Sequence, residues 1–263
     1  MEHDAAALAA KIKASPKYAG IAQETVLRVC EEYLPRYKSE KDAVKAVKRR
    51  LHTIHGAFFP EGSQKRAMAL IEDGSLDGRE LSLKLMALHP STRERLPFIG
   101  RFYAVLAPYL KEARSVWDIG CGFHPCALPF MGLPEGVLYR AGDIDQETVA
   151  VADAFLTRLS VRHEARMLDA TLTVPTEKAD AAFLFKLLPL LMQRDRGAVP
   201  KLLASLPADI LVVTFPVRSL SGRDKNMEAF YGEQFESGLP VGLSILKKET
   251  VGTELVYVVS RGA

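Results

Sequence analysis

The chain has 263 residues and a formal net charge of +3, with 48% hydrophobic and 25% charged residues, which is typical of globular proteins and excludes a disordered or fibrous one. Apolar runs near 183–192 and 210–217 are interrupted by Lys186, Pro189 and Pro216 and fall short of the roughly 18 residues of a membrane span, so we expect no membrane partner. The first residues are acidic where a signal peptide is positive, which predicts a cytoplasmic protein.

Residues 1–80 have the spacing of helices joined by short turns, without the alternation typical of strands. The clearest helix follows Ser39, which forms a capping-box pattern with Asp42. Apolar residues then recur every three or four positions and are expected to face a core, at Val44, Val47, Leu51 and Ile54. We interpret His52 and His55 as ordinary helix residues rather than metal ligands, because no third ligand lies near them in the sequence.

The other faces of this helix are basic and carry Lys45, Lys48 and Arg49. Lys and Arg outnumber Asp and Glu by five over residues 1–110, whereas the rest of the chain has an acidic excess of two. Such a surface either binds an anionic partner or is an ordinary solvated helix face. The charge pattern by itself leaves both interpretations open.

The strongest turn signal of the first half lies at 74–78, and we place a domain boundary near it. This divides the chain into a helical domain, 1–80, and a second domain, 81–263. A further capping-box pattern at 91–94 predicts the start of a helical stretch that runs to about Ala113.

Short apolar segments alternate with helical ones in the rest of the chain. Strands are predicted at 115–119, 137–142, 161–168, 179–185 and 210–215. This alternation predicts an α/β fold with a parallel sheet and helices on both faces. A last pair, 243–248 and 254–259, is joined by too few residues for a crossover and predicts an antiparallel hairpin. The arrangement resembles the Rossmann-like core of S-adenosylmethionine-dependent methyltransferases.

The first predicted strand ends in an Asp-x-Gly-x-Gly pattern at 118–122. Gly120 and Gly122 allow the backbone to approach a ligand, because no Cβ stands in the way. Pro125 occupies the third glycine position of the dinucleotide-binding pattern, which argues against a nicotinamide cofactor. S-adenosylmethionine has no phosphate, and the shorter pattern suits its sulfonium and amino-acid tail.

Two further aspartates follow the next strands. Asp143 ends the second strand, where its carboxylate is expected to accept hydrogen bonds from both ribose hydroxyls. Asp169 follows the third strand, where it is expected to bind the adenine amino group while Ala170 offers a backbone N–H to the ring. Each aspartate also fits a simple loop cap, but their order after the glycine pattern predicts a site for S-adenosylmethionine.

A narrower resemblance rests on five segments spread over most of the chain. They are 89–95 (HPSTRER), 118–125 (DIGCGFHP), 185–191 (FKLLPLL), 215–228 (FPVRSLSGRDKNME) and 252–255 (GTEL). Together they resemble the aminoglycoside-resistance 16S rRNA methyltransferases that modify N7 of guanine 1405 in the ribosomal decoding site. The resemblance implies a helical N-terminal domain before the methyltransferase core, and a cytoplasmic enzyme that acts on 16S rRNA within the 30S subunit as a monomer.

The resemblance also implies a set of cofactor contacts. They are Phe58, His89, Ser91, Arg95, Gly120, Asp143, Asp169, Ala170, Phe185 and Gln193. Arg95 is assigned to the cofactor carboxylate, for which a guanidinium is a suitable partner. Phe58 and Phe185 also fit a hydrophobic core. His124 departs from the family pattern, in which asparagine is commoner.

The loop after the fifth strand combines cationic and apolar residues, and with the basic helix it forms the expected RNA contact. These substrate residues are Lys45, Lys48, Arg49, Lys186, Arg218, Arg223, Lys225, Met227 and Glu228. Guanine N7 already has a lone pair, so no catalytic base is expected. No metal is expected either, because Cys30, Cys121 and Cys126 lack the spacing of a zinc site. Cys121 and Cys126 do not follow the fourth strand, where the nucleophile of cytosine C5 methyltransferases lies, so a covalent mechanism is disfavoured.

Two other functions remain open. Methylation of N1 of a nearby decoding-site adenine uses the same cofactor but a different base edge. A non-catalytic factor that binds the 30S subunit is the second, and the complete glycine and aspartate set argues against it.

Overall fold

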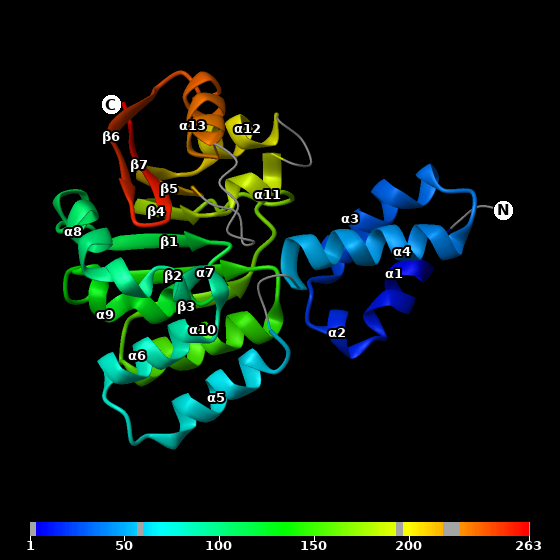
Figure 1. Cartoon of the computed structure of the whole chain (residues 1–263), viewed down its shortest axis with the longest axis horizontal. Helices are drawn as coiled ribbons and strands as arrows, with labels where there is room; N and C mark the ends of the chain where they lie inside the picture. The colour runs from blue at the N-terminus through cyan, green and yellow to red at the C-terminus, as the bar shows by residue number, and fades with distance from the viewer. Residues whose placement is uncertain (1–3, 57–59, 193–196, 218–226, 263) are drawn as a thin grey trace.

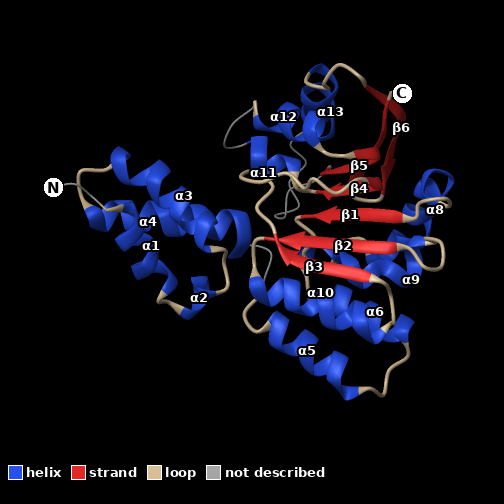
Figure 2. Ribbon diagram, turned by 180° about the vertical axis from the view of Figure 1, so that it is seen from behind, coloured by secondary structure: helices blue, strands red, loops and turns tan. Residues whose placement is uncertain are grey.

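The computed structural model describes residues 4–56, 60–192, 197–217 and 227–262. They form two parts that stand side by side (Figure 1). We call residues 4–56 the helical lobe and residues 60–262 the sheet lobe. Figure 2 shows from the other side that the helical lobe lies beyond the arrowheads of the parallel strands.

The helical lobe contains four α-helices and two shorter helical turns among its described residues. These are α1 (Ala5–Lys13), α2 (Pro16–Ala19), α3 (Gln23–Tyr33), the 3₁₀ turn Leu34–Arg36, α4 (Glu40–Leu51) and the π-helical turn His52–Gly56. The predicted apolar stripe is confirmed: Val47 and Leu51 are fully buried, and Val44 and Ile54 pack against the same core.

The predicted capping box of α4 is wrong in its chemistry. Ser39 stands at the N-cap position, but its hydroxyl makes no capping hydrogen bond. The acidic residues Glu40 and Asp42 lie in the first turn, where their charges stabilise the positive end of the helix dipole.

The sheet lobe alternates helices with strands. Its helices are α5 (Ser63–Asp73), α6 (Gly78–Ala87), α7 (Pro90–Arg93), α8 (Ile99–Leu110), α9 (Leu128–Met131), α10 (Gln146–Arg158), α11 (Leu188–Met192), α12 (Ala198–Ser205) and α13 (Met227–Ser237), with 3₁₀ turns at Leu96–Phe98 and His124–Ala127. Its strands are β1 (Ser115–Ile119), β2 (Leu138–Asp143), β3 (His163–Met167), β4 (Ala179–Phe185), β5 (Ala208–Pro216), β6 (Leu243–Val251) and β7 (Glu254–Arg261).

The strand order is β3-β2-β1-β4-β5-β7-β6. The first five strands pair in parallel, and β7 pairs antiparallel with β5 and β6, which confirms the predicted sheet and hairpin. The order reverses between β1 and β4, because the chain builds outward from β1 to β3 and then returns to the other side. In open sheets of this kind, ligands bind at the carboxyl ends of the strands beside that switch point.

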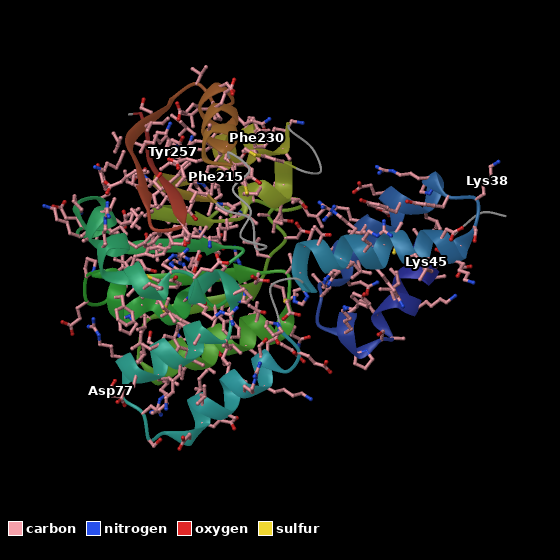
Figure 3. The ribbon with its side chains drawn as sticks, viewed as in Figure 1. Lys38, Lys45, Asp77, Phe215, Phe230 and Tyr257 are labelled. Atoms are coloured by element: carbon pink, nitrogen blue, oxygen red, sulfur yellow. The ribbon has the colours of Figure 1, made fainter. Side chains whose placement is uncertain are left out.

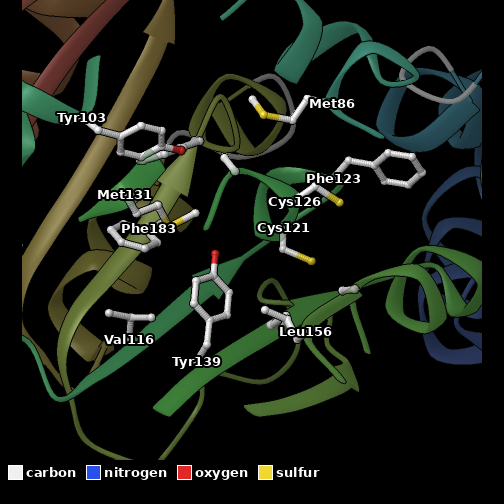
Figure 4. Close-up of a cluster of buried hydrophobic side chains, with 14 of the residues drawn as sticks. Met86, Tyr103, Val116, Cys121, Phe123, Cys126, Met131, Tyr139, Leu156 and Phe183 are labelled. Atoms are coloured by element: carbon white, nitrogen blue, oxygen red, sulfur yellow. The ribbon is translucent and has the colours of Figure 1, made fainter. Parts of the chain in front are cut away.

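Side chains alternate between the two faces of the sheet, as the strand geometry requires. Val116 and Phe183 face the core that α5, α6, α8 and α10 cover, part of which is drawn in Figure 4. Trp117 and Leu184 face the opposite core under α11 to α13. No helix among the described residues has the length and apolarity needed to cross a bilayer.

The hydrophobic cores bear on where the two parts of the chain meet. Leu51 belongs to the core of the helical lobe, whereas Ala67 and Ile71 of α5 pack into the core on the sheet. The change from one core to the other therefore lies between Leu51 and Ala67, before the turn at 74–78. That turn joins α5 to α6 within the sheet lobe. The predicted limits 1–80 and 81–263 stay a prediction about independent domains.

The second predicted capping box is also wrong. His89 is the N-cap of α7, and Ser91 lies inside this one-turn helix. Pro90 explains the shift, because its fixed φ angle favours the first position of a helix. The helical stretch is then interrupted by the 3₁₀ turn Leu96–Phe98 before α8 begins.

Candidate functional site

A cavity opens at the carboxyl ends of β1, β2 and β4, at the switch point of the sheet. Both lobes contribute to its walls. The helical lobe supplies Thr25, Arg28, Arg50, Ile54 and His55, and the sheet lobe supplies the ends of its strands and the loops that follow them.

The glycine turn after β1 forms one wall of this cavity. Gly120 and Gly122 have φ angles of +64° and +50°, which favour glycine. A Cβ at Gly122 would lie 3.2 Å from the imidazole of His89, and one at Gly120 would lie 3.0 Å from Leu187. The turn therefore needs both glycines for its backbone shape and for its close packing.

Asp143 ends β2 beside this turn and is almost fully buried. Its carboxylate accepts hydrogen bonds from the backbone N–H of Gly122 at 2.9 Å and of Asp145 at 3.2 Å. Burial raises the pKa of Asp143 to about 6, because it penalises the charged form more than the Gly122 hydrogen bond and the nearby His55 stabilise it. The carboxylate is thus fixed in place at the cavity with an unusual proton affinity.

Asp169 and Ala170 form another part of the wall, beyond the end of β3. The carboxylate accepts hydrogen bonds from the hydroxyl of Thr25 at 2.8 Å and from the N–H and hydroxyl of Thr171 at 2.9 and 2.5 Å. Burial raises its pKa, but the Thr171 hydrogen bond and the charge of Arg28 outweigh burial and lower the pKa below its ordinary value. Asp169 therefore stays ionised near neutral pH.

A cluster of four charged side chains lies at the inner end of the cavity, and we call it the charged cluster. Arg95 donates from Nε and Nη2 to both carboxylate oxygens of Glu254, at 2.9 and 2.8 Å. The amine of Lys186 lies 2.8 Å from Glu94 and 3.5 Å from Glu254. Arg95 and Glu254 are only 1% and 0% exposed, so this pair is removed from water.

The sequence prediction treated the Arg95 fork as a partner for a ligand. In the structure two of its three nitrogens already bind Glu254, and only Nη1 lies outside that pair. The guanidinium also lies against the rings of Phe102 and Phe185, at 4.4 and 4.8 Å from their centroids, and these two rings contact each other edge to face. Burial lowers the pKa of Arg95, but the charge of Glu254 raises it above its ordinary value, so the cation is permanent.

Lys186 has a backbone conformation that is unusual for its residue type. Its φ angle is +54°, a left-handed conformation that costs energy outside glycine and is often found at functional sites. The backbone N–H of Lys186 donates to the carbonyl of Thr214 at 3.0 Å, and the buried amine is held by the charged cluster. These contacts hold the strained residue against the cavity.

Behind the glycine turn lies a second buried polar group. Asp118 accepts hydrogen bonds from Nδ1 of His124 at 2.8 Å and from the hydroxyl of Tyr139 at 2.7 Å, and Tyr103 bonds to Nε2 of the same histidine. The departure at His124 is thus accommodated by a fully bonded network. Burial raises the pKa of the Cys121 and Cys126 thiols, which makes them poor nucleophiles.

The structure brings most of the predicted cofactor residues together. Those that line the cavity are His89, Ser91, Arg95, Gly120, Asp143, Asp169, Ala170 and Phe185. Of the predicted substrate residues Lys186 lies in the same cavity, whereas Met227 and Glu228 begin α13 outside it. The predicted residues Phe58, Gln193, Arg218, Arg223 and Lys225 lie outside the described residues.

The predicted docking residues Lys45, Lys48 and Arg49 do not line the cavity, although Arg50 of the same helix does. In Figure 3 Lys45 lies on the helical lobe, to the side of the sheet lobe. Its side chain is 67% exposed and lies 3.8 Å from Asp42, and Arg49 is exposed on the same helix. Lys48 is half-buried over the ring of Tyr18.

Sequence reasoning missed several polar residues of the site. Thr25, Arg28 and His55 come from the helical lobe, and Glu254 comes from the start of β7. Only Glu254 carried a signal, because an acidic residue at the start of an apolar strand is unusual. His55 was interpreted as an ordinary helix residue, but it is buried and its Nε2 lies 3.4 Å from Asp145.

The described residues contain no group of three or more His, Cys, Asp or Glu arranged to hold a metal ion. The model of the ribosomal RNA methyltransferase (FmrO) family matches residues 14–258. The chain belongs to this family. Membership confirms the resemblance that the motifs indicated, and the sheet topology confirms the α/β methyltransferase fold.

Relatives and solved structures agree with this family. The chain is 37% identical to the 16S rRNA (guanine(1405)-N(7))-methyltransferase of Serratia marcescens and 34% identical to that of Micromonospora echinospora, over 95% of this chain and 96% and 94% of the relatives. The crystal structure of the 16S rRNA methyltransferase RmtF in complex with S-adenosyl-L-homocysteine has a TM-score of 0.89 and 39% identity over 99% of both chains. The 16S rRNA methylase RmtB has a TM-score of 0.86 and 32% identity over 100% of both.

Proposed function

We propose that this protein transfers the methyl group of S-adenosylmethionine to N7 of guanine 1405 of 16S rRNA in the assembled 30S subunit, and thereby confers aminoglycoside resistance. The observation that carries this proposal is the near full-length match to relatives named for that reaction, at 34% and 37% identity. Because 30S subunits reside in the cytoplasm, we expect the enzyme to act there. We also expect it to act as a monomer.

The residues of the cavity suit S-adenosylmethionine. The left-handed glycine turn brings bare backbone to the cavity wall, where a Cβ would press on Leu187 or His89. The carboxylate of Asp143 would accept hydrogen bonds from the ribose hydroxyls, and Asp169 with Ala170 would bind the adenine. Nη1 of Arg95 would face the amino-acid carboxylate, while Phe185 and the buried His89 enclose the same space.

The cofactor, when bound, supplies an electrophilic methyl group. Guanine N7 has a lone pair, so the chain has to orient the base and exclude water rather than remove a proton. His89 fits this role, because burial first and the charges of Lys186 and Arg95 second lower its pKa to about 3 and keep it neutral. Lys186 lies at the cavity with its amine held by two carboxylates, which favours contact with the target base over contact with a phosphate.

Docking on the ribosome is assigned to the basic face of α4, with Lys45, Lys48 and Arg49. The predicted loop residues Arg218, Arg223 and Lys225, together with Met227 and Glu228, would hold the rRNA around the extruded guanine. The side chain of Glu228 accepts a hydrogen bond from the hydroxyl of Thr250 on β6, so α13, which follows this loop in the sequence, is fixed to the sheet. Phe230 on the same helix is half exposed and available for stacking.

Transfer of a tritiated methyl group to 30S subunits, followed by mapping of the modified nucleotide, tests the proposal. The expected result is stoichiometric labelling at N7 of guanine 1405. Labelling at N1 of an adenine would identify the alternative reaction, and 30S binding without labelling would identify a non-catalytic factor. Free 16S rRNA serves as the matched substrate control, because the proposal requires the assembled subunit.

A further inference from the structure

The two lobes meet along a seam at the mouth of the cavity. The backbone N–H of Ala22 donates to the carbonyl of Ile144 at 2.7 Å, and that of Gln146 donates to the carbonyl of Gly20 at 2.9 Å. A Cβ at Gly20 would lie 2.6 Å from a carboxylate oxygen of Asp145, so these two segments of the chain lie closer together than a larger residue at position 20 would allow. The segment before α3 is therefore bound to the loop that follows β2.

Side chains of α3 extend this seam to Asp169. Thr25 is fully buried and lines the cavity, and its hydroxyl donates to Oδ2 of the aspartate at 2.8 Å. Arg28 reaches the same oxygen at 3.4 Å, while Thr171 holds Oδ1 with its N–H and hydroxyl. The carboxylate is thus fixed from two sides, and one side belongs to a residue 144 positions earlier in the chain.

The contact of Thr25 fixes the plane of the carboxylate. An aspartate side chain rotates broadly about its terminal torsion unless donors hold both oxygens. Arg28 forms the longest of the four contacts, so the Thr25 hydroxyl at 2.8 Å is the closer of the two donors that orient Oδ2. A donor that enters the cavity therefore meets Oδ2 in the orientation that the Thr25 hydroxyl sets.

We propose that Thr25 is a positioning residue for the adenine end of the cofactor, acting through Asp169. The helical lobe then has a second task besides docking, because it completes the site that holds S-adenosylmethionine. This inference rests on the proposed function in assigning the adenine amino group to Asp169. It adds that the affinity for that group depends on a hydroxyl of the helical lobe.

The test measures binding of S-adenosylhomocysteine by calorimetry to the full-length protein, without RNA. Thr25→Val keeps the side-chain volume and removes the hydroxyl, and we expect it to weaken binding about tenfold, the size of one hydrogen bond to a charged group. Thr25→Ser keeps the hydroxyl and is expected to restore affinity to within about twofold of the unmodified protein. Thr53→Val is the matched control, because the Thr53 hydroxyl bonds to the carbonyl of Arg49 within its own lobe.

A second ligand separates positioning from general loosening of the seam. With an S-adenosylhomocysteine analogue that has hydrogen in place of the adenine amino group, Thr25→Val and the unmodified protein are expected to bind equally. Unchanged binding of S-adenosylhomocysteine to folded Thr25→Val, or an equal loss with both ligands, would overturn the proposal.

Thermal unfolding verifies that the variants are folded, and Thr25→Ala is measured in the same way should Thr25→Val fail to fold. The binding measurement contains no rRNA, so it does not depend on methylation of 30S subunits. Absence of that methylation would refute the proposed function without changing the result expected for Thr25.

Discussion

The charged cluster and the basic face of α4 contain the same kinds of side chain in opposite surroundings. In the cluster, Arg95 and Glu254 are 1% and 0% exposed and joined by two hydrogen bonds. On α4, Lys45 is 67% exposed in its side chain and 3.8 Å from its acidic neighbour. Burial turns the first pair into a rigid element of the site, whereas solvent leaves the second free to rearrange toward a partner.

The comparison teaches where charge determines geometry and where it determines attraction. A buried ion pair adds little folding stability compared with an apolar pair of similar volume. Removal of one member, however, leaves an uncompensated charge in a medium of low polarity and is strongly destabilising. Exposed charges are screened by salt over roughly 8 to 10 Å, so each one contributes little by itself. Several of them together attract a large anion such as RNA. The cluster should therefore control stability and cofactor geometry, and α4 should control encounter with the ribosome.

Loss of the buried acid is expected to have the largest effect. Glu254→Gln leaves Arg95 without its anionic partner, and we expect the free energy of unfolding to fall by about 3 to 5 kcal/mol in urea titrations. Glu249→Gln is the control on the adjacent strand, since Glu249 pairs with Arg101 and Lys247 at the surface. Similar unfolding curves for both variants would contradict the division between buried and exposed charge.

Asp143 extends the buried side of the comparison to the cofactor. Asp143→Ala removes the acceptor of the ribose hydroxyls and is expected to weaken S-adenosylmethionine binding by about 2 to 4 kcal/mol, measured by calorimetry. Asp153→Ala is the control, because Asp153 lies on the surface of α10 and pairs with His163. Unchanged affinity in folded Asp143→Ala would refute the ribose assignment.

The loop after β5 should combine both behaviours. We expect Arg218→Ala or Arg223→Ala to lower the rate of methylation by about a hundredfold while 30S affinity falls only modestly, because a shift of about 1 Å in the target base disrupts the in-line geometry. Single-turnover methylation and filter binding on the same variants decide between the roles. Equal losses in rate and affinity would make these arginines docking residues.

The raised pKa of Asp143 predicts a pH dependence of cofactor binding. Ribose hydroxyls bind the ionised carboxylate, so S-adenosylhomocysteine affinity should fall as the pH decreases through about 6, by about tenfold per unit below it. The folding stability of the protein without cofactor changes with pH in the opposite direction. A folded-state pKa above the ordinary 3.8 gives a stabilising contribution at low pH that is lost as the pH rises through about 6. Asp143→Asn should bind weakly and remove the pH dependence that this carboxyl causes; an unchanged pH profile would assign it to another group.

The smallest effect per residue is expected on α4. Lys45→Glu combined with Arg49→Glu should weaken 30S binding and reduce its salt dependence by about one unit of slope for each lost phosphate contact, with cofactor affinity unchanged. Lys84→Glu combined with Lys111→Glu makes the same charge change on exposed positions of the sheet lobe. If both pairs weaken 30S binding equally, α4 is only solvated surface.

Local patterns predicted the sheet and its glycine turn well. Short, nearly continuous apolar runs between helical patterns are typical of parallel strands that are buried on both faces, and this information lies within a few residues. The glycines after β1 and the aspartates after β2 and β3 were also visible, because strand ends of a parallel sheet meet at one edge. Helix caps were predicted less well, since Pro90 moved the start of α7 and Ser39 makes no capping bond.

The sequence by itself determined the fold class, the family resemblance and the glycine and aspartate positions of the cavity wall, since each depends on local periodicity or on a contiguous motif. Only the tertiary structure decided how the charges are paired. Arg95 and Glu254 are separated by 159 positions, and Thr25 and Asp169 by 144, so no local pattern indicates that they meet. Such partners are selected because a buried charge or hydroxyl must find a hydrogen bond wherever the folded chain brings one.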